Sequence, residues 1–292
     1  MAKPNTSLTK EQIFKQVKQL CMKADFVPSR HLICQAAGLN IADPMAISRS
    51  FIRHNTTNPV VHNMLDIEQA FVSLKKTFSE TEPAPFMAET AVRELTGILP
   101  LLNNKEKLFT RYWINNCQAY IPDLNPQERL NNIQEMIRLT PKGENDSLLF
   151  NCSNIIMDLE IDSGDRYRTI KKSYQKINKT GSYAANYKSL LNKSGYRYYQ
   201  YLISQANHTA VPYDKRCAAT YEAVDVINDL DYSVSRKCNL RIGLLGNLEK
   251  VQRQENDQAG LEKTTALKQK YANHAFNISR IFTNPQYADR FR

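Results

Sequence analysis

The chain of 292 residues is 42% hydrophobic, which is enough to bury a core in one large domain or two smaller ones. Its 9 glycines leave no glycine-rich phosphate loop, and its longest apolar run, Leu95 to Leu102, is too short to cross a bilayer. The net charge is +10, and the 6 cysteines are scattered without paired spacing, as in a protein with reduced thiols. Since MAKPNTSLTKEQ at the N-terminus has no apolar signal core, we expect a cytoplasmic protein without membrane insertion.

Helix-start signals recur from the N-terminus onward. Thr9 and Gln12 form a capping-box pattern, which satisfies two backbone donors at a helix start. Asn58 precedes Pro59, and proline is favoured at the first helical position because its missing N–H has no partner there. The run after Pro59 places its apolar residues on one stripe, and another helical run follows Pro85.

A domain boundary is expected in the segment 100–104, where one proline and two asparagines separate two apolar stretches. It divides the chain into an N-terminal helical domain, residues 1–102, and a second helical domain, residues 103–292. The helices predicted in the second domain are Lys105–Ile121, Pro126–Leu139, Ser147–Leu159, Asp165–Lys179, Tyr183–Asn192, Tyr196–Ala206, Tyr213–Asp229, Tyr232–Gln254 and about Leu261 to Phe282. Because no stretch alternates convincingly as a strand does, and the loops are short, we predict an all-α chain in which consecutive helices are antiparallel neighbours.

The sequence WINNCQAY, Trp113 to Tyr120, introduces a repeat pattern. Trp113, Cys117 and Tyr120 stand where the tetratricopeptide pattern has an aromatic, a small and an aromatic residue. Pro141 stands at the position where the pattern closes its second helix. Over about residues 105–229 the chain therefore resembles a degenerate member of the tetratricopeptide repeat family, although an ordinary helix pair could produce the same match.

The resemblance implies antiparallel helix pairs stacked as a solenoid, with long C-terminal helices that cap the last repeat. Trp113 and Tyr120 would then fill the seam between two paired helices, and the small Cys117 would let the backbones approach. Asn116 stands in place of Leu and Arg129 in place of Ala, so the repeat is a degenerate one. Proteins of this architecture present a concave face to a peptide or another protein.

Catalytic signatures are lacking: the sequence contains no Walker-type loop, no G-x-S-x-G and no H-E-x-x-H. His31 and Cys34 share a helix turn near Cys21, but a fourth metal ligand is missing, so a buried thiol beside a surface histidine is favoured. In DLEIDSGD, Asp158 to Asp165, the glycine is misplaced for a calcium loop. We expect no catalytic residue, no metal and no cofactor, while a Cys–His nucleophilic pair brought together by folding stays open.

The basicity of the chain is concentrated between Arg166 and Tyr213. These 48 residues contain no Asp or Glu, but they carry nine Lys or Arg and nine of the 15 tyrosines. Tyr196 and Tyr199 lie on one stripe of a predicted helix, and Tyr198 and Tyr201 lie on another. Since a surface helix needs only one buried stripe, one set of tyrosines is expected to face solvent or a groove.

Tyrosine combined with arginine is typical of binding hot spots, and lysines steer the encounter with an acidic surface. We therefore expect a non-catalytic scaffold that binds a protein with an acidic contact region. The partner-binding candidates are Arg168, Lys171, Lys172, Lys176, Lys188, Arg197, Tyr198 and Tyr201. One alternative is a helical-repeat protein that binds RNA or another single-stranded nucleic acid, because basic residues among aromatic ones suit a stacked strand. A solvated basic face without a partner is the other alternative.

In composition and build, the chain also resembles secreted effectors of intracellular bacteria, because it is rich in Asn and Lys, helical and without a catalytic signature. Within this class it is similar to the metaeffectors of Legionella, which bind and restrain another effector. The resemblance implies a virulence-associated regulator of a toxic effector. It also implies secretion into the cytosol of a host cell without a classical signal peptide.

Overall fold

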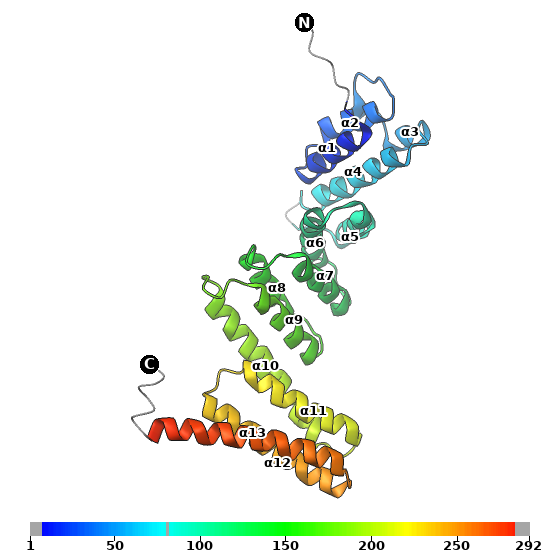
Figure 1. Cartoon of the computed structure of the whole chain (residues 1–292). Helices are drawn as coiled ribbons and strands as arrows, with labels where there is room; N and C mark the ends of the chain where they lie inside the picture. Colours follow the sequence, from blue (N-terminus) through cyan, green and yellow to red (C-terminus); the bar gives the residue numbers. More distant parts are fainter. Residues whose placement is uncertain (1–7, 80–81, 284–292) are drawn as a thin grey trace. The chain divides into compact units, whose positions relative to one another are not determined.

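The computed structural model describes residues 8–79 and 82–283, with side chains described as far as residue 279 (Figure 1). Within these ranges the secondary structure consists of thirteen α-helices and three short 3-10 helices without a strand, which confirms the all-α prediction. No helix in the described ranges is both long and apolar enough to span a bilayer. Residues 1–7, which belong to the stretch used to judge the absence of a signal peptide, lie outside the described residues.

The chain divides into two compact units, Met1–Thr140 (unit 1) and Pro141–Arg292 (unit 2). The boundary predicted at residue 102 falls inside unit 1, because the helices on its two sides pack against each other. There, the short helix η2 (Leu99–Leu101) is followed by Asn103, which caps the next helix in a capping box with Glu106. The proline and asparagines of this segment therefore make a tight connection within a unit rather than a linker.

Unit 1 contains eight further helical elements, and they begin where the sequence signals are. Thr9 and Gln12 form the predicted capping box, and Asn58 accepts a hydrogen bond from the N–H of Val60 ahead of a helix with proline in its first turn. The elements are α1 (Lys10–Met22), α2 (Phe26–Ala36), η1 (Pro44–Ala46), α3 (Arg49–His54), α4 (Pro59–Thr77), α5 (Pro85–Ile98), α6 (Asn104–Gln118) and α7 (Pro126–Leu139).

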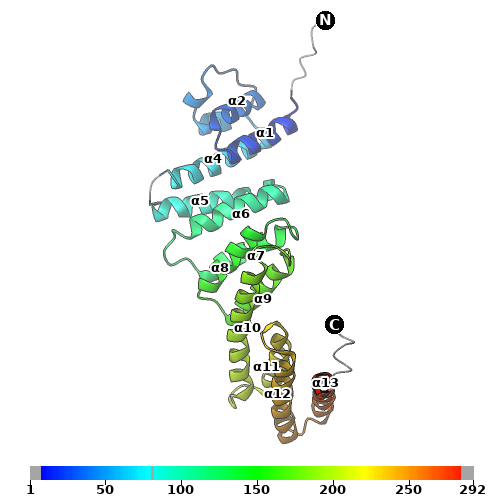
Figure 2. The same ribbon diagram turned by 90° about the vertical axis from the view of Figure 1, so that its left-hand side faces the viewer.

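The long helix α4 organises the first half of unit 1. It packs against α1, α2, α3 and α5, and α5, α6 and α7 then pack consecutively, as Figure 2 shows. Because α4 has neighbours on several sides, it buries more than one stripe; Val61, Met64, Leu65, Ile67 and Phe71 are all in the core.

Unit 2 also packs consecutive helices, from α8 with α9 to α12 with α13. Its elements are α8 (Asp146–Asp158), α9 (Ser163–Lys176), α10 (Ala184–Asn207), α11 (Tyr213–Val226), η3 (Ile227–Asp229), α12 (Val234–Gln254) and α13 (Gln258–Thr283). The last two are long helices that pack along each other, and both lie near the C-terminus, as the sequence predicts (Figure 1).

The prediction of two helices on either side of Gly195 is wrong, because α10 continues through this residue. Gly195 is buried, and a Cβ atom there would lie 3.3 Å from Cδ2 of Leu230 and 3.5 Å from Cε2 of Tyr167. Glycine at this position therefore lets neighbouring elements approach the helix closely instead of ending it.

Candidate functional site

The residues predicted to bind a partner lie on two neighbouring helices of unit 2. Arg168, Lys171, Lys172 and Lys176 belong to α9, while Lys188, Arg197, Tyr198 and Tyr201 belong to α10. The two helices pack against each other, so the structure brings the two halves of the predicted set onto adjacent elements.

Three of the six predicted cations already have a carboxylate partner from a later part of the chain. The pairs are Arg168 with Glu222 at 3.2 Å, Lys171 with Asp229 at 2.8 Å and Lys188 with Asp231 at 3.3 Å. All three acids follow Tyr213, where the acid-free segment ends, and folding places them beside the basic helices. The surface is therefore less positive than the sequence segment suggests.

The two predicted tyrosines differ in exposure. Tyr198 is only 4% exposed and its hydroxyl oxygen accepts a hydrogen bond from Arg168 at 3.0 Å, whereas Tyr201 is 45% exposed and its ring stacks on that of Tyr198. Burial, reinforced by the nearby carboxylate of Glu222, raises the pKa of the Tyr198 hydroxyl, so this phenol stays neutral. Tyr201 can therefore contact a partner directly, while the buried Tyr198 packs against the ring of Tyr201.

Of the other predicted cations, Lys172 and Arg197 are exposed, and no carboxylate in the described part of the chain pairs with either. Lys176 is half-buried at the end of α9, and its carbonyl oxygen accepts a hydrogen bond from the N–H of Gly143. Lys172 and Arg197 are thus the members of the predicted set whose charge is available to a partner.

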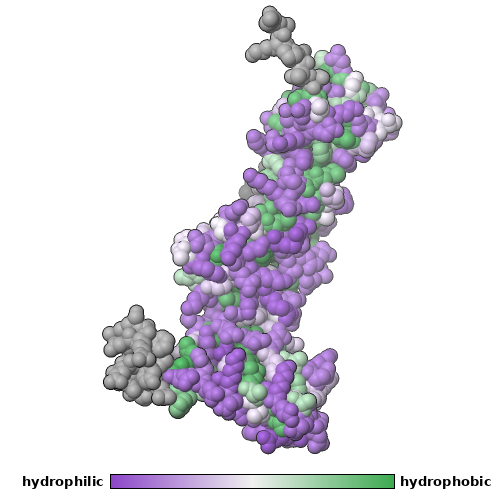
Figure 3. All heavy atoms as spheres, viewed as in Figure 1, coloured by the Kyte–Doolittle hydropathy of each residue, from purple (hydrophilic) through white to green (hydrophobic). Residues whose placement is uncertain are grey.

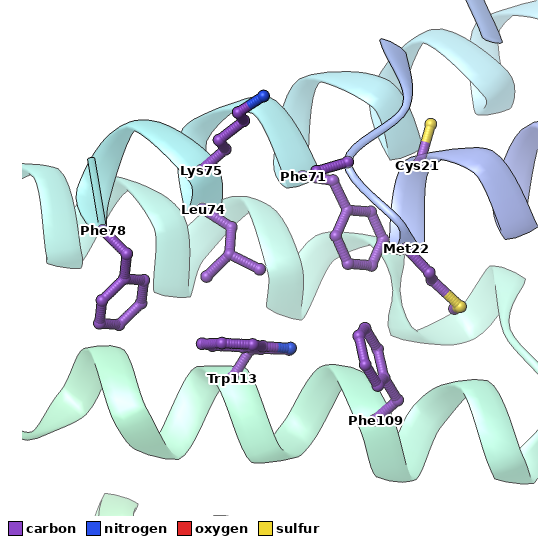
Figure 4. Close-up of a pocket in the computed structure, with 9 residues that line it drawn as sticks. Cys21, Met22, Phe71, Leu74, Lys75, Phe78, Phe109 and Trp113 are labelled. Atoms are coloured by element: carbon purple, nitrogen blue, oxygen red, sulfur yellow. The ribbon is translucent and has the colours of Figure 1, made fainter. Parts of the chain in front are cut away.

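A second candidate site, which the sequence did not predict, is a hollow in unit 1 (Figure 4). We call it the aromatic hollow. It has a volume of about 220 Å³ and lies between the C-terminal end of α1, the second half of α4 and the middle of α6. Its lining residues are Cys21, Met22, Ala24, Phe71, Leu74, Lys75, Phe78, Phe109 and Trp113.

Four aromatic rings form a continuous wall of this hollow. Phe71 lies 6.4 Å from Phe109, Phe109 lies 6.4 Å from Trp113, and Trp113 lies 5.5 Å from Phe78, measured between ring centroids. Tilted and edge-on arrangements at these distances are favourable for aromatic pairs. Phe109 is 38% exposed and Trp113 is partly buried, so the wall presents apolar surface to solvent.

Two polar groups accompany the apolar wall. The indole nitrogen of Trp113 points along the hollow toward Phe109, and no residue in the described part of the chain accepts a hydrogen bond from it (Figure 4). Lys75 also lines the hollow, but its ammonium group points away from the four rings and lies 5.6 Å from the ring centroid of Phe26; it pairs with no carboxylate among the described residues (Figure 4). The hollow therefore offers one uncharged donor to whatever occupies it, with one cation on its outer side.

The surface around this hollow is also rich in apolar groups. In the view of Figure 3, hydrophobic side chains gather over α4 to α6, while hydrophilic side chains cover most of the remaining face of unit 1. Tyr112 on α6 is 40% exposed and its ring lies 5.5 Å from that of Trp113. The sequence signal was available: Phe109, Tyr112 and Trp113 are more aromatic surface than the buried stripe of α6, which includes Ile114 and Cys117, requires.

Two residues of the predicted repeat, Trp113 and Tyr120, share an aromatic neighbour in unit 1. Trp113 and Tyr120 both contact the ring of Phe78, which follows α4, at 5.5 Å and 5.9 Å. Since α7 contains no aromatic residue, these ring contacts do not test the predicted seam between α6 and α7, which stays a prediction. Cys117 is fully buried, and Pro141 is the first residue of unit 2.

The cysteines show no sign of activation. Burial raises the pKa of Cys21, Cys117 and Cys152 to about 12, so these thiols are protonated at neutral pH. Burial also raises the pKa of Cys34 and Cys217. In the ranges that the structure describes, no three His, Cys, Asp or Glu side chains are grouped closely enough to hold a metal ion.

A comparison of the chain with protein families, with curated proteins and with solved structures finds no match.

Proposed function

We propose that the chain is a non-catalytic protein-binding scaffold and that the aromatic hollow of unit 1 receives an apolar side chain of its partner. The observation that carries the proposal is the partly exposed wall of Phe71, Phe109, Trp113 and Phe78 around an open volume. Large apolar side chains that enter pockets lined by aromatic residues supply most of the binding free energy in protein interfaces.

The size of the hollow favours a single side chain over a small-molecule ligand. Its volume of about 220 Å³ is below the roughly 300–1,000 Å³ of pockets that enclose a drug-sized ligand or cofactor. Its walls offer one indole N–H, and the ammonium of Lys75 points outward, so there are too few polar groups to orient a polar metabolite. A leucine, methionine or phenylalanine side chain would fill it, and the Trp113 N–H could reach a backbone carbonyl beside that side chain.

The free cations favour an acidic partner, as the sequence does. Lys75 carries an unpaired charge on the outer side of the hollow, and Lys172 and Arg197 are unpaired on unit 2. Carboxylates beside the apolar anchor of the partner would complement Lys75 and accelerate the encounter. We also propose that the helix pairs stack as in tetratricopeptide proteins, since such arrays bind other proteins through their helical faces.

The resemblance to metaeffectors gives the proposal its most specific form. The chain resembles the Legionella metaeffector MesI in its size and in its helical structure with one degenerate repeat. If the resemblance holds, the partner is the effector SidI, and the role of the chain is to restrain a toxic protein in a host cell.

The proposal is tested by affinity capture with the full chain, followed by mass spectrometry, with and without nuclease treatment. The test variant is Phe109→Ala, and its matched control is Phe86→Ala, which removes an aromatic ring that is 68% exposed on α5 outside the hollow. A partner that binds the wild type and the control should bind Phe109→Ala about 30-fold more weakly, the loss of roughly 2 kcal/mol typical of a hot spot. Equal capture by all three proteins contradicts the role of the hollow, and loss of every partner with nuclease supports nucleic-acid binding instead.

A test of the role of the charges on unit 2 must change cations that form no ion pair within the protein. Reversing Lys171 would leave Asp229 beside a new negative charge, so we choose Lys172→Glu and Arg197→Glu. With the partner captured above, each reversal should slow association and flatten its dependence on salt, while dissociation changes little. Unchanged association rates would show that these cations of unit 2 do not attract the partner. They would not contradict the role proposed for the aromatic hollow.

A further inference from the structure

A groove in unit 2 lies between α10 and α12, separate from the aromatic hollow. It exists because both helices pack on α11, while they are not among the helix pairs that pack closely with each other. Its volume is about 590 Å³, and its floor is made by half-buried or buried apolar side chains, Tyr199 and Ile203 on α10 and Leu240 and Leu244 on α12. We call it the amide groove because of the polar residues above this floor.

Three of the polar residues that line the amide groove are asparagines, which carry carboxamides. Asn239 and Asn247 both border the groove from α12, eight residues apart and about 80° apart round the helix, and Asn207 stands at the end of α10. All three are exposed, and no residue in the described part of the chain is hydrogen-bonded to their side chains. Each carboxamide can donate and accept at once, which matches the N–H and C=O of a peptide backbone.

The spacing of these carboxamides also matches an extended chain. Eight residues of α-helix span about 12 Å at 1.5 Å per residue. Four residues of an extended strand span about 13 Å, and backbone groups two residues apart point in the same direction. Asn239 and Asn247 can therefore reach equivalent backbone groups of one extended segment that runs along α12.

Gly243, midway between the two asparagines, keeps the groove open. A Cβ atom at this position would meet nothing within 4 Å, so the glycine is not needed for packing inside unit 2. Glycine in the middle of a helix is unfavourable relative to alanine. The empty space above Gly243 is where a bound backbone could approach α12 most closely.

The few charges in the amide groove argue against nucleic acids and metal ions as its ligands. Arg236 is the one charged residue among the eleven that line the groove, and no carboxylate in the described part of the chain pairs with it. A nucleic acid would need several cations along its backbone, and a metal ion would need carboxylates. The backbone of a helical ligand is already hydrogen-bonded internally, so it would leave the carboxamides unused.

We propose that the amide groove binds an extended peptide segment of a partner protein. Asn239 and Asn247 hydrogen-bond its backbone, the apolar floor receives its alternate side chains, and Arg236 pairs with an acidic side chain near one end. The amide groove would recognise mainly the backbone of its ligand, whereas the aromatic hollow would bind one anchoring side chain. The two sites can therefore bind the same partner or different ones.

The test uses a random dodecapeptide library displayed on phage and selected against the full chain. Enriched peptides are synthesised with a fluorescent label, and their affinities are measured by anisotropy. Gly243→Leu places a side chain in the groove at a position where a Cβ atom meets nothing within 4 Å, and we expect it to weaken binding roughly tenfold or more. Asn239→Ala and Asn247→Ala should each weaken binding about three- to tenfold, the effect of one hydrogen bond.

The controls match these substitutions outside the groove. Asn186→Ala removes an exposed asparagine in the first turn of α10, and Gly97→Leu adds a side chain to a helical glycine of unit 1 whose Cβ would also meet nothing within 4 Å. Both should bind like the wild type. Far-UV circular dichroism checks that Gly243→Leu is folded, and Gly243→Ala serves as the milder variant if it is not.

Two further readouts decide the binding mode. Phe109→Ala should bind the peptide like the wild type, because Phe109 does not line the amide groove. Methylating a single backbone nitrogen of the peptide should weaken binding at least as much as Asn239→Ala or Asn247→Ala where that nitrogen faces one of these residues. The proposal is overturned if no peptide is enriched, if Gly243→Leu binds like the wild type, or if the peptide gains helical circular dichroism when it binds.

Discussion

Glu68 on α4 and Arg30 on α2 form an ion pair inside unit 1, where the two side chains are 0% and 5% exposed. Nε of Arg30 donates to both carboxylate oxygens, at 3.0 and 2.9 Å, and Nη1 donates to the carbonyl oxygen of Ile47 at 2.8 Å. Arg49 at the start of α3 donates to the same carboxylate at 3.0 Å. One buried carboxylate on α4 therefore holds α2 and α3, and Arg30 extends the network to Ile47 in the segment between these two helices.

Glu68→Gln should destabilise unit 1 by about 3–5 kcal/mol, because Arg30 would remain buried with its charge unpaired. The measurement is urea unfolding followed by the fluorescence of Trp113, which lies in unit 1 and is the only tryptophan. Replacing both partners, with Arg30→Met and Glu68→Leu together, should recover most of the loss, since an apolar pair leaves no buried charge.

The matched control for this pair is Glu135→Gln, which removes a carboxylate paired with Arg138 on the surface of α7. An exposed pair one helical turn apart contributes about 0.5 kcal/mol or less. A loss below about 1 kcal/mol for Glu68→Gln would contradict this prediction, because it would show that the Arg30 guanidinium tolerates burial without a carboxylate partner.

The thiols give a direct check of the packing of both units. Cys21, Cys117 and Cys152 are buried and their pKa values are raised to about 12, so they should not react with Ellman's reagent at pH 8 in the folded chain. Cys217 is half-buried and should react first, though more slowly than a free thiol because its pKa is also raised by burial. All six should react at once in urea, and rapid labelling of three or more folded thiols would contradict the packing.

Local chemistry made the helices predictable from sequence. Thr9, Asn58 and Pro85 each begin a helix where the sequence places a start, because capping and proline preferences act within one turn. Gly195 misled the prediction because glycine is typical both of helix ends and of close packing between elements. Only the positions of Tyr167 and Leu230 beside α10 show which role it has.

The candidate sites depended on contacts between distant segments. The segment from Arg166 to Tyr213 contains no acid, but Glu222, Asp229 and Asp231 fold against it and pair with its cations. The aromatic hollow combines residues from α1, α4 and α6, which no single motif joins. Charge counted along a sequence therefore overestimates the charge of the folded surface wherever pairing is non-local.

Gly195 and Gly243 both lie inside helices of unit 2 but differ in their surroundings. Adding a Cβ at Gly195 would press on Leu230 at 3.3 Å, whereas one at Gly243 would meet open space. Gly243→Ala should stabilise the chain by about 0.5–1 kcal/mol from helix propensity alone. Gly195→Leu should destabilise it by about 1–3 kcal/mol through overpacking, while Gly243→Leu should not. Urea unfolding followed by circular dichroism compares the variants, and equal effects of leucine at the two sites would contradict the close packing at Gly195.

The contact between α12 and α13 should depend on pH through Glu249. Its carboxylate accepts hydrogen bonds from Nζ of Lys268 at 2.6 Å and from the hydroxyl of Thr265 at 3.0 Å. The bond from Lys268 lowers the pKa of Glu249 below its ordinary value of 4.5, against the opposing effect of burial. Because the folded pKa is depressed, this stabilisation is fully present above pH 4.5 and is lost as the pH falls through the folded pKa.

Glu249→Gln should therefore speed hydrogen exchange of α13 at pH 7 by about fivefold, the effect of roughly 1 kcal/mol for a partly exposed pair. Wild type and variant are compared by mass spectrometry at the same pH, so the intrinsic pH dependence of exchange cancels. The lowered pKa of Asp257, caused by its hydrogen bond from Tyr213, is common to both proteins and cancels as well. Glu255→Gln, an exposed carboxylate at the end of α12, should leave exchange unchanged. If the difference between wild type and Glu249→Gln does not shrink as the pH is lowered from 7 to values below 4.5, the contact with Lys268 is not what holds α13 in place, because a protonated Glu249 can no longer pair with the ammonium group.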